Sequence, residues 1–547
     1  MISDGLDGLD EIRHDVCIVG SGPVGLSLAM ELARKGKRVL LLESGHRKPD
    51  EDIQALSDAT IVDPAVHDDV LITVARRLGG TSNLWGARCQ PYDPIDFVPR
   101  PQAGEVDWPI RREDLLSFYD RACHYANCGS PVFSRSLEGI TCRDNRVDIR
   151  RVERFSNKPI FQLAHAAELD GNAQIDIRLN ATVVDIAFEG EEATKVTVCR
   201  PDGARQAVPV RTVVLAMGGL ESTRLMLSVQ RREGHRFGGL DGPLGRNYMG
   251  HLIGEVADVT FANDEIDRAF DFHVDEHGSY SRHRMIPSDE CQLNQGLLNV
   301  SFWPVVPPVD DPTHQSGILS LAALAMSIKP IGRLLVAEAI RRYHAPENMK
   351  RSPHVVNVTK GLPSVLSYIP QFFYKRYFAE MRLPGFFLRN PGRRYGLSYH
   401  AEQSPHPDSR VTLGDEVDRL GLPRLVVDLR FRREDGEALF RAHQVIRDWL
   451  QKTGLGSLVY RQPENETVDA IMSIASHGTH QIGLARMGSD PRKAIVDADL
   501  RCFGTSNVYV AGSAVLPTSG QANPTLTAIA LAVRLADHLS QADRQRA

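Results

Sequence analysis

The chain has 547 residues, a formal net charge of −5 and 42% hydrophobic residues, which is the composition of an ordinary globular protein. The slight negative charge gives no basis for nucleic-acid binding, and no apolar run approaches the roughly 18 residues of a membrane-spanning helix. The N-terminus is acidic and lacks a signal-peptide core, and the eight cysteines contain no Cys-x-x-Cys pair, so we expect a reducing, cytoplasmic location and no metal site.

The first predicted elements form a dinucleotide-binding unit. Its parts, in chain order, are an apolar strand at 16–19, Gly20-x-Gly22-x-x-Gly25, a helix at 26–34, an apolar strand at 39–42 and Glu43. In such units the three glycines make the turn, let the backbone approach a pyrophosphate, and let helix and strand pack closely. The helix N-terminus attracts phosphate, and Glu43 can accept hydrogen bonds from a ribose. The position of this unit at the head of a long chain favours FAD.

A second segment, at 78–97, is expected to contact the same cofactor. Two glycines and several small polar residues lead into Trp85. Such a segment can lie flat against a planar ring with its N–H groups free to donate hydrogen bonds, although an ordinary loop around a buried tryptophan is the alternative. The residues expected to contact the cofactor here are Gly80, Thr81, Asn83 and Trp85.

The middle of the chain predicts a continuation of the nucleotide sheet and then a second lobe. Alternating apolar residues from 175 to 215 predict several strands, and a second glycine turn then opens a helix. This second unit would close the sheet with Val183 near the adenine. We expect an α/β fold, in which a Rossmann-like FAD-binding domain is interleaved with an α+β substrate-binding domain built on an antiparallel sheet. The expected parts are 1–251 (FAD-binding, with some substrate-lobe insertions), 252–475 (substrate-binding) and 476–547 (completing the FAD domain and active site).

Residues 318–394 differ from the rest of the second lobe. They combine apolar and small residues with aromatic residues, and Lys375, Arg376, Arg382 and other cations lie among the aromatics. This composition indicates helices that cover the substrate lobe, or a basic, aromatic surface that makes peripheral contact with a membrane or a lipid-linked substrate.

The C-terminal 75 residues carry the expected chemistry. A histidine- and glycine-rich segment at 476–488 precedes a strand at 508–512, and a helix begins at Pro524 directly after Asn523. The dipole of this helix would stabilise negative charge at the O2 edge of a reduced isoalloxazine ring. We therefore expect Gly512, Pro524 and Thr525 to contact the cofactor.

On these motifs the chain resembles the glucose–methanol–choline (GMC) flavin oxidoreductases over nearly its whole length. His480, three residues before Gly483, matches the catalytic histidine of that family, and Asn523 occupies the position of the second catalytic residue. The closest similarity is to the subgroup of pyranose 2-oxidase and bacterial glycoside 3-oxidases. Pyranose oxidases have a flavin-bonded histidine where this chain has Leu84, so the FAD is expected to be non-covalent.

The resemblance implies an enzyme of EC 1.1 type that oxidises the CH–OH group of a sugar, glycoside or polyol. Imidazole suits proton removal at neutral pH, so His480 is the expected base, and the Asn523 amide would hold the alcohol oxygen. The alternatives are a hydrophobic or lipid-linked alcohol as substrate, a flavoprotein without alcohol-oxidising activity, and an NAD-dependent dehydrogenase. The electron acceptor would be oxygen, a quinone or a redox protein.

Overall fold

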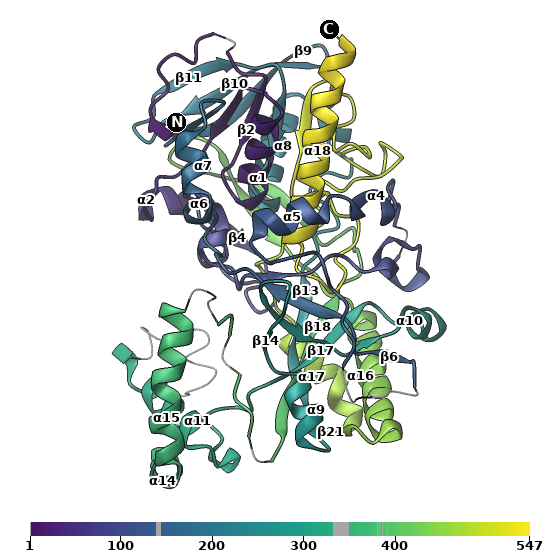
Figure 1. Cartoon of the computed structure of the whole chain (residues 1–547). Coiled ribbons are helices and arrows are strands. Elements are labelled where there is room, and N and C mark those ends of the chain that lie inside the picture. Colours follow the sequence, from purple (N-terminus) through teal and green to yellow (C-terminus); the bar gives the residue numbers. More distant parts are fainter. Residues whose placement is uncertain are drawn as a thin grey trace.

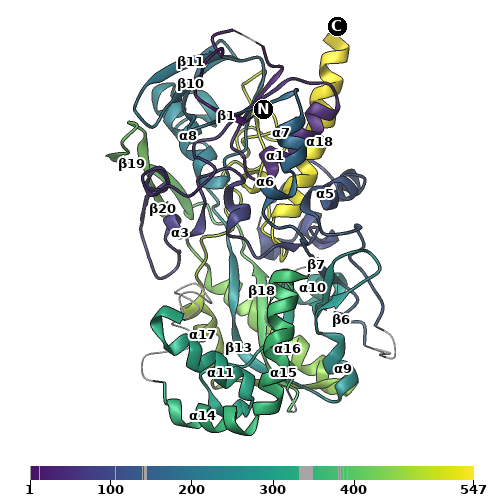
Figure 2. The same cartoon turned by 60° about the vertical axis from the view of Figure 1, so that its left-hand side comes forward.

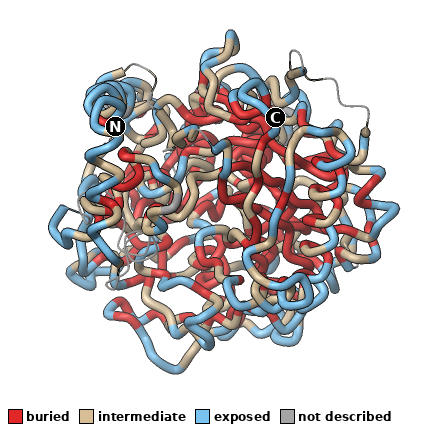
Figure 3. Tube along the Cα trace, turned by 90° about the horizontal axis from the view of Figure 1, so that it is seen from below, coloured by how far each residue is buried: buried red, intermediate tan, exposed pale blue. Residues whose placement is uncertain are grey.

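The computed structural model describes the chain except for Met1, Ile12, Glu105, Glu380, Arg382, Phe386, Pro391, Ala547 and residues 138–139, 141–143 and 332–348. The predictions that involve Arg382 and part of 318–394 therefore lie outside the described residues. Figure 1 shows an upper part, which holds both chain ends, above a lower part built around β13 and β18. Buried segments run through the interior of the molecule, whereas most exposed segments follow its outer loops (Figure 3).

The upper part is built on a six-stranded sheet in which every pairing is parallel. In sheet order the strands are β1 (Ile2–Asp4), β8 (Ile175–Leu179), β3 (Val39–Leu42), β2 (Val16–Val19), β12 (Val213–Leu215) and β22 (Val508–Val510). β2, β3, β12 and β22 are buried at every residue, as expected for apolar runs covered on both faces. The head, middle and tail of the chain thus meet in one sheet.

Three helices of the upper part matter for the site: α1 (Pro23–Arg34), α8 (Gly219–Arg232) and α18 (Thr525–Arg546), of which α1 packs against α18. The predicted end of α1 is confirmed, since the helix stops at Arg34 and Gly36 has a φ of 79°, which favours glycine. The segment after Arg112 forms two short helices, α4 (Glu113–Leu116) and α5 (Tyr119–Ala126).

The lower part is built on an antiparallel sheet with its own hydrophobic core. In sheet order its strands are β17 (Val300–Val305), β18 (Arg394–Glu402), β13 (His251–Phe261) and β21 (Gly456–Tyr460). The helix α16 (Arg433–Thr453) packs against β21 and inserts the fully buried Trp449 into this core, and α17 (Thr467–Ile474) packs beside it.

Several chain segments pass between the two parts. From the N-terminal half, β5 (Arg88–Cys89) and β7 (Val152–Phe155) join a sheet with β14 (His273–Val274) and β15 (Tyr280–His283). In the same way β4 (Ala59–Ile61) pairs with β20 (Pro423–Asp428), whose other neighbour is β19 (Arg410–Val417). The side chains of Val411 and Leu425 belong to the core of the upper part. The chain therefore crosses repeatedly between the upper and lower parts, and the predicted domain boundaries at residues 251 and 475 stay a prediction.

The remaining short elements complete the two parts. They are β6 (Val147–Asp148), β9 (Thr182–Glu189), β10 (Glu192–Cys199), β11 (Arg205–Pro209), β16 (Ile286–Pro287), α2 (Glu51–Gln54), α3 (Val70–Thr73), α6 (Phe161–Ala164), α7 (Ala166–Gly171), α9 (Asp264–Ala269) and α10 (Asp289–Gln295).

A group of helices extends from the lower part, and we call it the helical lobe (Figures 1 and 2). It consists of α11 (Gly317–Ser327), α14 (Arg351–Lys360) and α15 (Leu362–Phe373), with the helical turn 374–378 after α15. These helices pack on one another, and Leu319, Ala323 and Met326 form a separate small core with Val309. Within the described chain, no helix combines the length and apolarity needed to cross a bilayer.

Candidate functional site

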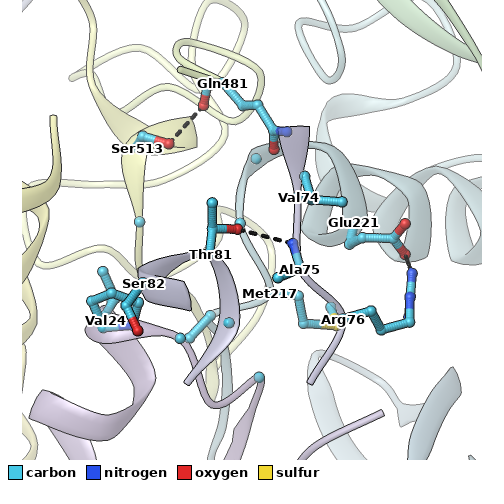
Figure 4. Close-up of a pocket in the computed structure, with 18 of the residues that line it drawn as sticks. Val24, Val74, Ala75, Arg76, Thr81, Ser82, Met217, Glu221, Gln481 and Ser513 are labelled. Atoms are coloured by element: carbon cyan, nitrogen blue, oxygen red, sulfur yellow. Dashed lines mark hydrogen bonds and ion pairs between the residues drawn. The ribbon is translucent and has the colours of Figure 1, made fainter. Parts of the chain in front are cut away.

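A cavity of about 520 Å³ lies where the two parts meet, and its walls come from distant segments of the chain. This volume is within the range of about 300–1,000 Å³ that is usual for ligand pockets. Figure 4 shows residues from the head, middle and tail of the sequence around it. Of the residues expected to bind cofactor or substrate, those that line the cavity are Gly20, Gly22, Glu43, Gly80, Thr81, Trp85, Val183, Gly512, Pro524, Thr525, His480 and Asn523.

Two residues expected to contact the cofactor do not line this cavity, Gly25 and Asn83. A Cβ on Gly25 would lie 2.0 Å from the carbonyl oxygen of Gly20, so Gly25 serves the close packing of helix on strand. The amide nitrogen of Asn83 donates to the carbonyl oxygens of Leu78 and Gly80. Asn83 therefore shapes the 79–85 loop.

The nucleotide end of the cavity is a backbone cradle. Gly22 caps the N-terminus of α1 with no side-chain hydrogen bond, so the first N–H groups of this helix are left for a ligand. A Cβ on Gly80 would lie 2.8 Å from the Cα of Gly22, which shows how closely the two glycine segments approach. Glu43 is buried and accepts hydrogen bonds from the backbone N–H of Ser21 and Gly45, and its remaining lone pairs can accept more. These features fit a dinucleotide.

Charged pairs that sequence analysis missed also line the nucleotide end. Arg76 pairs with Glu221 at 2.6 Å, and Arg224 pairs with Asp418 at 2.8 Å. Figure 4 shows the first of these pairs facing the cavity from two segments. The partners are far apart in sequence and carry no local motif, so no pattern in the sequence identified them.

At the other end of the cavity, His480 and Asn523 form a hydrogen-bonded pair. The amide nitrogen of Asn523 lies 3.0 Å from Nε2 of His480, and Nδ1 of His480 lies 2.9 Å from Nδ1 of His251. Nε2 of His251 lies 3.2 Å from the carbonyl oxygen of Ser519, which can only accept. These partners assign the protons: His251 carries its proton on Nε2, and His480 donates from Nδ1 and keeps Nε2 unprotonated.

Two more histidines complete a cluster at this end. Nε2 of His477 accepts a hydrogen bond from the backbone N–H of His480 at 3.0 Å, so His477 supports the segment that carries His480. The ring of His400 stacks on that of His251 with centroids 4.0 Å apart, and its Nδ1 donates to the carbonyl oxygen of Gln521. His251 and His400 were not identified from the sequence because they lie on β13 and β18, about 150 residues apart, and meet only through strand pairing.

The environment keeps these histidines neutral. Burial lowers the pKa of His480 well below 6.5, and the neighbouring His477, His251 and Arg88 lower it further. Burial likewise lowers the pKa of His477 to about 3. His480 is thus neutral, and its Nε2 lone pair, which here accepts from the Asn523 amide, can serve as a general base when a substrate hydroxyl takes the place of that amide.

His251, His477 and His480 also place ring nitrogens within 4.8 Å of one another, which would permit a metal ion. Those nitrogens already hold partners, however, because His251 and His480 share a hydrogen bond and His477 accepts one from the backbone. We therefore interpret the group as a hydrogen-bonded cluster.

Two acceptor atoms at this end are left without partners by the described residues: Oδ1 of Asn523 and Nε2 of His400. Buried polar atoms rarely remain unpaired, so each calls for a hydrogen-bond donor. Both residues line the cavity, together with Arg88, Ile253 and Trp303. None of the described residues between 372 and 387 lines it, so those aromatics do not form a pocket for a hydrophobic alcohol here.

Comparisons with known proteins agree with this geometry. Residues 405–532 match the family model described as GMC oxidoreductase, and residues 13–56 match an FAD binding domain. The chain is 21% identical to 2-methyl-1,2-propanediol dehydrogenase of Mycolicibacterium austroafricanum, over 97% of this chain and 95% of that protein. It is 24% identical to 6'''-hydroxyparomomycin C oxidase of Streptomyces lividus, over 99% and 94%.

Shorter and structural similarities extend the comparison. A C-glycoside 3-oxidase of Arthrobacter globiformis is 32% identical over 28% of each chain. The solved structure of pyridoxine 4-oxidase from Mesorbium loti superimposes with a TM-score of 0.51 at 17% identity, covering 96% of this chain and 99% of that one. The parallel sheet, the glycine cradle and these matches define an FAD-dependent oxidoreductase. Within that class, residues 405–532 form a GMC oxidoreductase domain, and the relatives that cover nearly the whole chain are a dehydrogenase and an oxidase by name.

Proposed function

We propose that the protein oxidises a CH–OH group of a sugar, glycoside or polyol to a carbonyl. The observation that carries this proposal is the end of the cavity where unprotonated Nε2 of His480 lies beside two unpaired acceptors, Oδ1 of Asn523 and Nε2 of His400. A substrate with several hydroxyl groups supplies the donors that these atoms lack. Two of the relatives are a propanediol dehydrogenase and a C-glycoside oxidase by name, which supports an alcohol of this kind.

Different cavity residues would hold different parts of FAD. The N-terminus of α1 would hold the pyrophosphate, Glu43 the ribose, and the loop at 80–85 would lie against the ring with Gly512 and the start of α18. When bound, FAD supplies the acceptor for the hydride. Leu84 lines the cavity and its aliphatic side chain has no group that could bond to the ring, so FAD would be held non-covalently.

The proton is moved by residues of the chain. As the substrate C–H bond breaks, the alcohol must lose its O–H proton, and Nε2 of His480 takes it while the amide of Asn523 donates to the alcohol oxygen. The new charge on His480 is shared through its Nδ1–H to Nδ1 of His251, whose own Nε2–H points to the carbonyl of Ser519. His251 is therefore a positioning residue that sets the tautomer of His480.

The test is anaerobic reduction of the bound flavin by a panel of sugars, glycosides and polyols, followed at the visible flavin band. We expect His480→Ala to retain FAD and to lose on the order of 10²-fold or more of the reduction rate. A His480→Ala enzyme that reduces its flavin at the normal rate would remove His480 from its assigned role. Repeating the panel with oxygen and with quinones identifies the electron acceptor, which no residue described here specifies.

We also propose that the helical lobe makes peripheral contact with an anionic membrane surface. Its described residues, 317–331 and 349–379, contain no aspartate or glutamate, and they include six lysines and arginines. Large apolar side chains on the same lobe are exposed, namely Leu366 (64%), Tyr374 (63%) and Phe378 (77%). Exposed apolar side chains, on a lobe whose described residues include cations and no carboxylates, are the composition of a surface that lies on anionic lipid. The cytoplasmic location stays a prediction.

A further inference from the structure

The cation Arg88 lines the cavity at the end where His480 lies. Its charge acts on His251, His400 and His480, and its guanidinium carbon lies 5.2 Å from the ring centre of Trp303. The other charged residues of the cavity wall are Glu43, Arg76, Glu221, Arg224 and Asp418.

Those other charged groups have dedicated partners, whereas Arg88 shares its partner. Arg76 and Arg224 each pair with a carboxylate of the cavity wall, and Glu43 accepts hydrogen bonds from Ser21 and Gly45. The carboxylate next to Arg88 is that of Glu153, 3.2 Å from Nε of Arg88.

Glu153 serves three arginines at once. Besides Arg88, it pairs with Arg282 at 2.5 Å and with Arg284, and it is fully buried. The guanidinium carbons of all three arginines lie within 6 Å of the Trp303 ring centre, that of Arg284 at 3.6 Å. One carboxylate among three guanidinium groups leaves a local surplus of positive charge inside the protein.

Arg88 and Glu153 are both charged at neutral pH. The arginines hold the pKa of Glu153 at about 2, and burial with Arg282 nearby lowers the pKa of Arg88 only to about 10, whereas burial lowers the pKa of Arg284 well below 12.5. Nη2 of Arg88 is buried and finds no hydrogen-bonding partner in the described part of the chain. A buried charge with an unpaired N–H group is costly unless an anion completes it.

We propose that Arg88 binds a carboxylate carried by the substrate, so that the alcohol oxidised belongs to a sugar acid or to a glycoside of one. A guanidinium group and a carboxylate match in geometry and charge, and Arg88 has N–H groups left after its contact with Glu153. This inference rests on the proposed function. The electron balance is unchanged: the carbinol carbon loses a hydride to the flavin, its hydroxyl proton goes to Nε2 of His480, and the carboxylate is a spectator.

The experiment compares matched acidic and neutral compounds on the FAD-loaded enzyme. The pairs are methyl β-D-glucuronide against methyl β-D-glucoside, and gluconate against sorbitol. We expect the acidic member of a pair to reduce the flavin anaerobically with an apparent Kd at least about 10-fold lower, because a buried charge pair contributes more than 1.4 kcal/mol to binding. In Arg88→Gln the acidic member should lose its advantage in apparent Kd over the neutral member, whatever change both members share because a charge near His480 is gone, and Arg88→Lys should restore part of the advantage.

Arg150→Gln is the matched control, since it removes one positive charge from a side chain that is 66% exposed and does not line the cavity. It should leave the preference intact. If Arg88→Gln weakens the apparent affinity for acidic and neutral compounds equally, Arg88 acts on the site only through its electric field, and the inference is overturned. An absence of any acidic preference in the wild-type enzyme would do the same.

A binding measurement separates this inference from the proposed function. Glucuronate should perturb the visible spectrum of the oxidised flavin in the wild-type enzyme and not in Arg88→Gln, whether or not turnover follows. Binding without reduction by any compound would count against alcohol oxidation and support the anion site. Reduction by neutral sugars, with no perturbation by glucuronate, would support the proposed function and overturn the anion site.

Discussion

Replacing His251 tests whether the proton chain at the site has the arrangement deduced from its hydrogen bonds. His251→Leu removes the acceptor of the Nδ1–H of His480, which lies 2.9 Å away. A hydrogen bond to a group that becomes charged contributes about 1.5–3 kcal/mol. Since 1.36 kcal/mol changes a rate tenfold, the rate of anaerobic flavin reduction should fall on the order of 10- to 100-fold.

The conservative variant His251→Asn separates positioning from packing, because the Asn oxygen can take the place of Nδ1 and accept the same proton. It should recover most of the reduction rate. His443→Leu is the matched control: His443 is fully buried, its ring bonds to Leu439 of its own helix, and it does not line the cavity. A His251→Leu enzyme that holds FAD and reduces it at the wild-type rate would refute the reasoning, as would equal losses in His251→Leu and His251→Asn.

Four other predictions follow from features described above. The base acts unprotonated, and burial lowers the pKa of His480, so the rate of flavin reduction by substrate should be independent of pH between 6 and 8. A rise in this rate centred at pH 6.5 would contradict the lowered pKa. A Cβ at Gly22 meets no protein atom within 4 Å, so Gly22→Val should fold and should lose FAD because the new side chain clashes with the cofactor alone. Gly171 is equally open and lies outside the cavity, so Gly171→Val should keep its FAD. Acid precipitation should release all the flavin, and colour left in the pellet would contradict non-covalent binding. The protein should sediment with anionic vesicles at low salt and not with zwitterionic ones. Leu366→Glu should weaken this binding. Leu163 is 68% exposed but lies outside the helical lobe, so Leu163→Glu should not weaken it.

Local patterns predicted the nucleotide sheet well. The predicted strands at 16–19 and 39–42 have the same bounds in the structure, and the strands near 213 and 508 are present. Each is a short, continuous apolar run next to a glycine turn, so neighbouring residues alone determine it. His480 and Asn523, which the structure brings together at the cavity, could likewise be singled out because each lies in a distinctive motif, and their catalytic roles stay a prediction.

Long-range pairing accounts for what the sequence could not show. Glu153, Arg282 and Arg284 look like ordinary strand residues until β7 and β15 pair and bring them together behind Arg88. His251 lies at the predicted end of the FAD-binding part, and no local motif singles it out. For the same reason the sequence did not predict that residues 410–428 pack with the upper part. β20 pairs there with β4, which lies some 350 residues earlier in the chain.

The order in which this polypeptide is synthesised bears on when it can acquire its cofactor. β22 and α18 supply one wall of the cavity, and both come from the last part of the sequence. A nascent chain that stops before β22 lacks that wall, so it can contact the nucleotide half of FAD at most. Enclosing the flavin ring therefore waits until β22 and α18 have been synthesised, and chains that stop before residue 508 should retain little or no flavin.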